Sequence, residues 1–495
     1  MLVMFMVVPL FCAFLITLAG RRSKNLSEYT AQGAAAMLAV GAILLMRSVL
    51  ATGTIVNAVG GWRPPLGICM VADGFSAFML VIVNCVSLVV IISASDSMRW
   101  YTEKWKFYTL LMLLIAGMNG VIMSGDLFTL YVFLELASVA GYILVAFGTE
   151  AESLEAAFRY AIMGSLASIL ILLGIALLYS YASTLNMADA ATVLTAHPKG
   201  ILVGFVSVLF LAGFGFKCGL VPFHAWLPDA YTTAPAPVSA IFAGTLSKTL
   251  GVYALCRIFF NVIGICPRTL HIFMALGLLS MVVGALLALV QDDTKRMFAY
   301  SSISQIGLVV FALGIGTPLA VFAALFHLGN HASFKALLFL NAGALEQAAG
   351  YRDMKKAGGL GAQLPVTGVT GLFASMSLAG VRPFAGFWSK LLIIIAAIQA
   401  RQYIPALIAV LASVLTLAYC LKFLTRTFFS SANKPQRALR EAPWSTRIAM
   451  VALATVCAVG MLALTPAFKP YVRCAADALM AGTGYKDAIL MVIKT

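Results

Sequence analysis

The sequence predicts an all-α integral membrane protein with about fourteen transmembrane helices. Hydrophobic residues make up 62% of the chain and charged residues only 10%, whereas soluble domains average about 45–50% and about 25%. Apolar runs of about 20 residues recur along the whole length, and each can cross roughly 30 Å of hydrocarbon as a helix. Short polar connectors separate these runs, so we expect a single polytopic membrane domain over residues 1–495.

The apolar runs define the predicted spans. No basic residue precedes the first run, so we interpret it as a span and not as a cleaved signal peptide. The predicted spans are 2–20, 29–51, 73–95, 107–124, 127–148, 159–182, 200–219, 238–260, 270–291, 299–316, 319–345, 366–400 (interrupted), 403–428 and 447–467.

In such a protein the net charge of +15 follows from the positive-inside rule and does not indicate nucleic-acid binding, and the distribution of the basic residues among the loops indicates the orientation in the membrane. Basic residues are roughly twice as frequent in the odd-numbered loops as in the even-numbered ones, which identifies the cytoplasmic side. Lys104 and Lys295 are among the first set, whereas Arg257 and Lys469 belong to the second. We therefore expect a multi-pass protein of the inner (cytoplasmic) membrane with both termini outside.

Two predicted spans contain helix-breaking residues. The seventh runs into a segment with Pro222, and the twelfth contains Arg382, Pro383 and Gly386. Such breaks free backbone polar groups, which must be buried in protein or lie beside water. Paired breaks in two halves of a chain indicate inverted repeats. We expect two five-helix repeats, at 107–260 and 270–428, with broken helices 7 and 12.

Nine ionisable side chains remain inside apolar segments once the loops are set aside. A charged side chain at the bilayer centre costs about 2.5–3.5 kcal/mol on insertion scales, so each is a functional candidate by default. The nine are Arg47, Glu135, Lys217, Lys248, His327, His331, Lys335, Arg382 and Lys390.

Glu135 is the only carboxylate that the predicted spans place deep in the membrane. A lone buried carboxylate is protonated, whereas a neighbouring lysine keeps it charged. Lys217, beside the seventh break, is the natural partner, because a buried lysine changes its protonation readily. A static ion pair joining two helices is the alternative. Lys248 lies half-way along the eighth span, too deep to reach an interface easily, and we expect it to carry protons.

His327, His331 and Lys335 recur every four residues in the eleventh span and therefore lie on one helix face. They cover roughly 12 Å along the axis at 1.5 Å per residue. Histidine titrates near neutrality, so this stripe forms a chain that water can join. Zinc binding is the alternative, but no acidic or thiol third ligand is nearby, and we expect no metal. Lys390, after the second break, is the predicted outlet.

The roles of three further residues stay open. Arg382 either bonds carbonyls freed at the second break or belongs to the path, and we favour the structural role. His224 and Asp229 follow the seventh span, where they either guard the cytoplasmic entrance or cap a helix. The nine cysteines are scattered without a CxxC or Cys/His cluster, which predicts buried filler instead of disulfides or iron–sulfur ligands.

The segments that carry these residues resemble the antiporter-like subunits shared by respiratory complex I, membrane-bound energy-converting hydrogenases and multi-subunit cation/proton antiporters. The matching segments lie over roughly residues 73–400 and read SGDLFTLYVFLELASVAGY, GFGFKCGLVPFHAWLPDAY, APVSAIFAGTLSKTLGVYAL, DDTKRMFAYSSISQIG, FHLGNHASFKALLFLNAGAL and GFWSKLL. The length and the first segment are most similar to the D-type antiporter subunit.

The resemblance implies fourteen spans, two inverted repeats and two broken helices. It also implies that Glu135 and Lys217 match the family's ion pair, Lys248 its central lysine and Lys390 its terminal residue. Two features depart from the family: Arg382 precedes a single proline where two are common, and the chain ends soon after the last span, without a long lateral helix.

These residues predict a proton-translocating, or proton/sodium-antiporting, subunit of a multi-subunit energy-converting complex. Nucleotide motifs and cluster or haem ligands are absent from the sequence, so we expect no cofactor and no catalytic redox site in this chain. Partner membrane subunits, such as antiporter-like paralogues and small subunits, with or without a hydrophilic redox arm, must then supply the energy. A stand-alone secondary transporter of an organic solute and a non-conducting scaffold are the alternatives.

Overall fold

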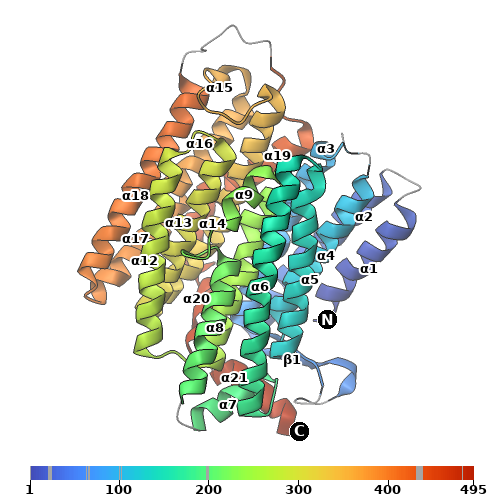
Figure 1. The fold of residues 1–495 in the computed structure, drawn as a ribbon, viewed down its shortest axis with the longest axis vertical. Helices are drawn as coiled ribbons and strands as arrows, with labels where there is room; N and C mark the ends of the chain where they lie inside the picture. Colours follow the sequence, from blue (N-terminus) through green and yellow to red (C-terminus); the bar gives the residue numbers. More distant parts are fainter. Residues whose placement is uncertain are drawn as a thin grey trace.

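The chain forms a bundle of long helices in the computed structural model (Figure 1). The structure describes residues 2–20, 25–62, 64, 67–99, 101, 103–196, 200–430, 439–481 and 483–494. Within these residues, eleven helices are long and apolar enough to cross a membrane, and four shorter apolar helices accompany them. The expectation of a mostly helical, multi-pass membrane protein is confirmed. Several basic residues used for the orientation, such as Arg21 and Lys199, lie outside the described residues.

The elements follow one another from the first helix to a pair of short C-terminal helices. In the first half they are α1 (Met4–Ala19), α2 (Leu26–Thr52), β1 (Ile55–Ala58), β2 (Cys69–Ala72), α3 (Gly74–Ser97), α4 (Lys104–Met123), α5 (Leu127–Val145), α6 (Ala151–Ala182), α7 (Met187–Ala196), α8 (Ile201–Cys218), α9 (Trp226–Thr233), α10 (Ala236–Ile241), the π-helix η3 (Phe242–Tyr253), α11 (Ala254–Cys256) and the π-helix η4 (Arg257–Val262).

The second half begins with the long helix α12. Its elements are α12 (Pro267–Val290), α13 (Thr294–Ile315), α14 (Pro318–Ala349), α15 (Leu360–Gln363), α16 (Pro365–Ala379), α17 (Ala385–Gln399), α18 (Tyr403–Leu424) with the short π-helix η5 (Thr425–Phe429), α19 (Trp444–Val459), α20 (Lys469–Ala481) and α21 (Thr483–Lys494), besides three single-turn 3₁₀ segments, η1 (Val59–Gly61), η2 (Ala146–Gly148) and η6 (Gly460–Leu464).

The helices divide into a buried centre and an apolar rim. Helix α14 is in contact with α13, α16, α17, α19 and η3, and α13 and α14 are buried over most of their length. Helix α6 instead turns large apolar side chains outward, among them Phe158, Leu166 and Ile169. Apolar side chains on an outward face suit lipid, whereas His327, His331 and Lys335 of α14 lie in the protein interior.

Both segments expected to be interrupted consist of two helices joined by a non-helical turn. Helix α8 ends at Gly219 (φ 73°) and α16 ends at Gly380 (φ 81°). The next backbone N–H in each case donates five residues back, from Leu220 to Gly215 and from Val381 to Met376. This is the Schellman ending, which requires a left-handed residue and therefore favours glycine. A cis X–Pro bond follows both glycines, before Pro222 and before Pro383.

The two ends of the bundle differ in what covers them. We name them the α15 end and the α7 end after the helices that lie there in Figure 1. At the α15 end, Asp292 forms ion pairs of 2.6, 2.9 and 2.8 Å with Lys355, Lys422 and Arg426. These partners hold the pKa of Asp292 at about 2, below its ordinary value of 3.8, because the two lysines donate hydrogen bonds to the carboxylate.

The α7 end carries a hairpin and the C-terminal helices. Strands β1 and β2 pair antiparallel, with Ile55 opposite Ala72 and Ala58 opposite Cys69. Helix α20 packs on α3, and α21 packs on α7 and β1. From the sequence, the chain was expected to end soon after the last span, and these two helices were not predicted. They are short and amphipathic and therefore carry a weak hydropathy signal.

Candidate functional site

Glu135 and Lys217 lie together at the end of α8, next to the first break. The Lys217 Nζ atom is 3.9 Å from the Glu135 carboxylate, at the long end of an ion pair, and donates a hydrogen bond of 2.8 Å to Ser138. Ser168 on α6 donates to Glu135. The Lys217 side chain is 1% exposed, whereas that of Glu135 is 27% exposed. Serine hydroxyls therefore hold the two charges near each other without a tight bond between them.

Lys248 is fully buried in the π-helix η3, and its Nζ atom donates to the carbonyl of Ala243 in the same helix. A π-helical segment is rare and often marks a functional site. Here it places the ammonium group beside a carbonyl of its own helix. Helix α14, which carries Lys335 and both histidines, packs directly on η3. The structure therefore brings Lys248 to the stripe on α14.

The stripe on α14 consists of His327, His331 and Lys335, all fully buried. The two histidine rings are 6.2 Å apart between centroids. At one end, Lys335 donates to the carbonyl of Phe298 (2.9 Å) and to Ser301 on α13. Three ring nitrogens, both of His331 and Nε2 of His327, have no hydrogen-bond partner among the described protein atoms. Buried polar atoms normally have a partner, so these nitrogens leave unused hydrogen-bonding positions along this face.

The other end of the stripe meets the second break through α17. His327 Nδ1 is 2.8 Å from Ser389 Oγ, and the next residue, Lys390, donates to the carbonyls of Leu378 (2.7 Å) and Ala379 (3.4 Å). These are the carbonyls left free where α16 ends. Lys390 therefore caps the broken helix from within, a favourable place for a positive charge.

The sequence analysis favoured Arg382 as the residue that bonds the carbonyls freed at the second break, and this is wrong. Lys390 bonds the freed carbonyls, whereas Arg382 is exposed and lies over the rings of Phe387 and Trp388, 5.0 and 5.3 Å from their centroids. Lys390 can reach these carbonyls because α17 passes close to α16 at Gly386, where an added Cβ would lie 1.8 Å from the Ser377 carbonyl oxygen.

The two residues proposed for an entrance are separated. His224 is part of the turn between α8 and α9 near Pro222, and its Nδ1 atom has no partner among the described protein atoms. Asp229 lies on α9 and pairs with Arg159 (3.3 Å) and Arg296 (3.0 Å). These three charged residues line an open cavity of about 340 Å³ at the α15 end. Asp229 therefore lines this cavity, whereas His224 is not among its lining residues.

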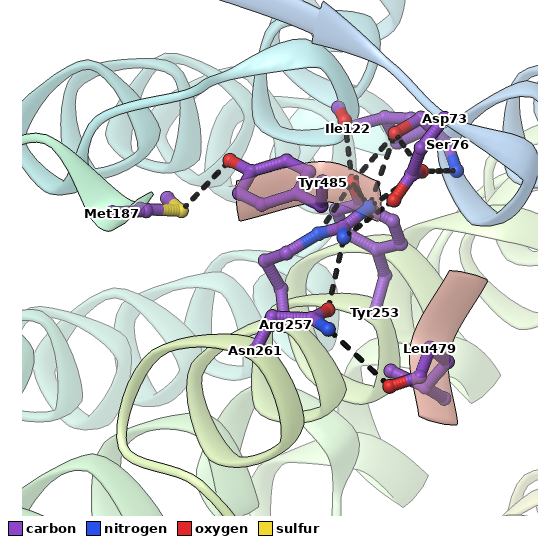
Figure 2. A network of polar contacts seen from close by, with 9 residues as sticks. All are labelled: Asp73, Ser76, Ile122, Met187, Tyr253, Arg257, Asn261, Leu479 and Tyr485. Carbon is purple, nitrogen blue, oxygen red and sulfur yellow. Dashed lines mark hydrogen bonds and ion pairs between the residues drawn. The ribbon is translucent and has the colours of Figure 1, made fainter. Parts of the chain in front are cut away.

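Two ion pairs with a buried basic residue were missed by the sequence analysis. Lys295, assigned to a loop, is buried and contacts Glu346 on α14 at 2.7 Å, beside a second open cavity of about 370 Å³. Arg257, also assigned to a loop, is buried against Asp73 at 2.8 Å (Figure 2). Asp73 and Glu346 were not recognised because they stand where the predicted spans begin or end. A charge at a span boundary was the only available signal.

The fold and these contacts define a polytopic membrane protein with a row of buried titratable side chains. The chain belongs to the family described as NADH:quinone oxidoreductase/Mrp antiporter, TM, whose model matches residues 124–416. The resemblance stated from the sequence motifs is thereby confirmed.

Relatives from two kinds of complex match the chain equally well. It is 34% identical to the D subunit of the Na(+)/H(+) antiporter of Alkalihalophilus pseudofirmus, over 90% of this chain and 91% of that one. It is also 34% identical to the N subunit of the NADH-quinone oxidoreductase of Desulforudis audaxviator, over 90% of each chain. A chain in the structure of the Mrp complex from Dietzia sp. DQ12-45-1b superimposes with a TM-score of 0.90 at 28% identity, covering 99% of both chains.

Proposed function

We propose that this chain is a proton-translocating, or proton/sodium-antiporting, membrane subunit of a multi-subunit energy-converting complex. The likeness to the D subunit of an antiporter, to the N subunit of a quinone oxidoreductase and to the Mrp complex supports a role of this kind. The observation that carries the proposal is the stripe on α14, which packs on the π-helix of Lys248 and contacts, through His327, Ser389, the residue next to Lys390.

In the proposed route a proton enters near Lys217, passes Lys248 and the stripe of Lys335, His331 and His327, and leaves at Lys390. Glu135 acts as the switch. When its charge approaches Lys217 the lysine is favoured in its charged form, and when the charge withdraws the lysine releases its proton. The 3.9 Å separation supports a pair that can open and close, as do the separate serine partners of its members, Ser138 for Lys217 and Ser168 for Glu135.

We further propose that the α15 end faces the cytoplasm, with both termini outside, as the positive-inside rule implies. The two open cavities at this end lead towards Asp229 and towards Lys295. Asp229 then belongs to the entrance, as the sequence analysis suggested. Lys295 offers a second approach, since it begins the helix on which Ser301 contacts Lys335.

Fourteen spans result if α1, α14 and the broken pair α16–α17 cross the membrane together with the eleven long apolar helices. We propose that residues 107–260 and 270–428 are two inverted repeats. Their support is the equal construction of the two breaks: each has a Schellman ending at glycine, and three residues later a proline that follows a cis bond.

Partner subunits are required, because the proposed route moves charge without supplying energy. The position of Glu135 favours a partner subunit that contacts α5. Its partly exposed carboxylate lies on a face of that helix that also exposes Phe128, Val132 and Val139. An uncovered carboxylate beside lipid is costly. A neighbouring membrane subunit over this face would shield Glu135 and could also move its charge.

The proposal is tested by Lys248→Ala in the assembled complex, reconstituted in vesicles with a proton-sensitive dye. Driven proton transport should be abolished, because Lys248 is the group through which the proposed route passes from Lys217 to the stripe on α14. Lys106→Ala is the matched control, since that lysine is half exposed and pairs with Glu103 at the surface.

Normal subunit content combined with unchanged transport in Lys248→Ala would reject the proton route and favour a scaffold. An organic-solute transporter would instead show solute-dependent uptake that does not need the partner subunits.

A further inference from the structure

A buried polar network at the α7 end is built around Asp73 and Arg257 (Figure 2). Asp73 is the residue before α3, where its carboxylate accepts a hydrogen bond from the Ser76 backbone, and Arg257 begins η4. Both side chains are 1% exposed, and two parallel hydrogen bonds of 2.8 Å join the guanidinium to the carboxylate. This fork geometry is the strongest form of the Arg–carboxylate contact.

Every donor of the guanidinium has an acceptor. Besides the two bonds to Asp73, Nη1 donates to Asn261 (2.9 Å). Nη2 donates to Ser76 (3.1 Å), and both Nη2 and Nε donate to the Tyr253 hydroxyl, at 3.0 and 3.3 Å. The Tyr253 hydroxyl in turn donates to a backbone carbonyl of α4 at 2.5 Å. The network is therefore saturated.

A saturated network around arginine does not pass protons. Arginine stays protonated in proteins, so it cannot release a proton and accept another. A relay also needs a group with a free donor or acceptor position, as the His331 ring nitrogens have on α14. The Asp73–Arg257 network has the opposite character to the proposed route, although both are buried and polar.

The network lies between Lys248 and an open cavity at the α7 end. Tyr253 and Arg257 follow Lys248 by five and nine residues in one continuous helical segment, which places the guanidinium on the order of 10 Å further towards the α7 end. Beyond it lies an open cavity of about 610 Å³ whose lining includes Gly74 and Tyr485. Water that fills this cavity would meet the network before it could approach Lys248.

The C-terminal helices hold the network closed. The Tyr485 ring of α21 lies over the guanidinium, 4.5 Å from its carbon to the ring centroid, and Asn261 donates to the Leu479 carbonyl of α20 at 3.2 Å. Helix α20 also packs so closely on the start of α3 that a Cβ on Gly74 would lie 2.5 Å from the Cys474 carbonyl oxygen. Helices α20 and α21 thus cover the side of the network that faces the cavity.

We infer that the Asp73–Arg257 network, covered by α20 and α21, is a proton seal that closes the α7 end of the path beneath Lys248, so that protons leave only at Lys390. The inference rests on the proposed function. It assigns a role to the C-terminal helices, which the proton route itself does not use.

The test measures passive proton leak of the complete complex in vesicles, with a pH gradient imposed and no driving reaction. Asp73→Asn combined with Arg257→Gln removes both charges, approximately keeps the shapes and loosens the network. The leak should rise several-fold over the wild type. It should fall back to the wild-type level when Lys248→Ala is added, because the leak passes through that lysine.

The matched control changes the same residue types beside the same cavity. Arg473 and Asp477 of α20 form an exposed ion pair at 3.7 Å, so Arg473→Gln with Asp477→Asn should leave the leak unchanged. If the buried double variant does not assemble, Tyr485→Leu removes the covering ring alone and should also raise the leak.

An assembled seal variant with wild-type leak would overturn the inference, and so would a leak that persists after Lys248→Ala. Both results are distinct from a failure of the proposed function. That failure would appear as normal driven transport in Lys248→Ala without any seal substitution.

Discussion

Gly386→Ala tests whether Lys390 must be held at the end of α16. The added Cβ would lie 1.8 Å from the Ser377 carbonyl oxygen, and such contacts do not fall below 3.0 Å, so α17 must move by about 1.2 Å. A shift along the bond lengthens the contact from Lys390 to the Leu378 carbonyl from 2.7 Å to about 3.9 Å, beyond hydrogen-bonding reach. The weaker 3.4 Å bond to Ala379 is lost as well.

The expected loss follows from the charge on the lysine. Hydrogen bonds to charged groups contribute about 1.5–3 kcal/mol, which corresponds to a fall in transport of roughly ten- to a hundredfold if the charged form is a required intermediate. The assay is driven proton uptake into vesicles that contain the assembled complex. Subunit content and thermal stability measured on the same preparation separate lost transport from lost assembly.

Gly33→Ala is the matched control, because a Cβ on this helical glycine of α2 meets no atom within 4 Å. It should leave transport unchanged and be neutral or slightly stabilising. Wild-type transport in an assembled Gly386→Ala complex would refute the reasoning, since it would mean that Lys390 acts without the carbonyls of α16 or that α17 accommodates the methyl group without moving.

Two further outcomes are expected. Ser138→Ala removes the hydroxyl that accepts a 2.8 Å hydrogen bond from Lys217 and should lower transport. Ser207→Ala is the control, because Ser207 lies on the same helix as Lys217 and bonds only to its own helix; equal transport rates in both variants would contradict the role of Ser138 in holding Lys217. Asp292→Asn should lower the melting temperature of the complex at pH 7. Because the folded pKa of Asp292 is depressed to about 2, its stabilisation is present above about pH 4 and is lost as the pH falls towards 2, so a gap between variant and wild type that stays constant over this range would contradict the assignment.

Much of the row of buried titratable side chains was predictable because burial of charge is visible in a hydropathy pattern. Glu135, Lys217, Lys248 and the stripe on α14 stand out against apolar neighbours, and helical spacing alone puts the three stripe residues on one face. The breaks were predictable for the same reason, since glycine and proline interrupt a helix wherever they occur. Their local construction, with glycine in the left-handed conformation, follows from backbone sterics.

The roles of individual charges at the second break were not predictable. Arg382 and Lys390 are eight positions apart, and either could have reached the freed carbonyls. The close approach of α17 to α16 at Gly386 decides for Lys390, and the exposed Arg382 stacks on aromatic rings instead. Such a choice depends on which helix faces meet, and hydropathy carries no information about that.

Local composition thus determines which segments enter the membrane and which side chains cost free energy when they are buried there. Each of these properties depends only on a residue and its near neighbours in the sequence. Pairing between distant segments is decided only when the helices pack. Asp73 and Arg257 are 184 positions apart and each stands at a predicted span boundary, where a charge looks ordinary. Their contact, and the C-terminal helices that cover it, arise because a buried charge must find its partner in three dimensions, wherever along the chain that partner lies.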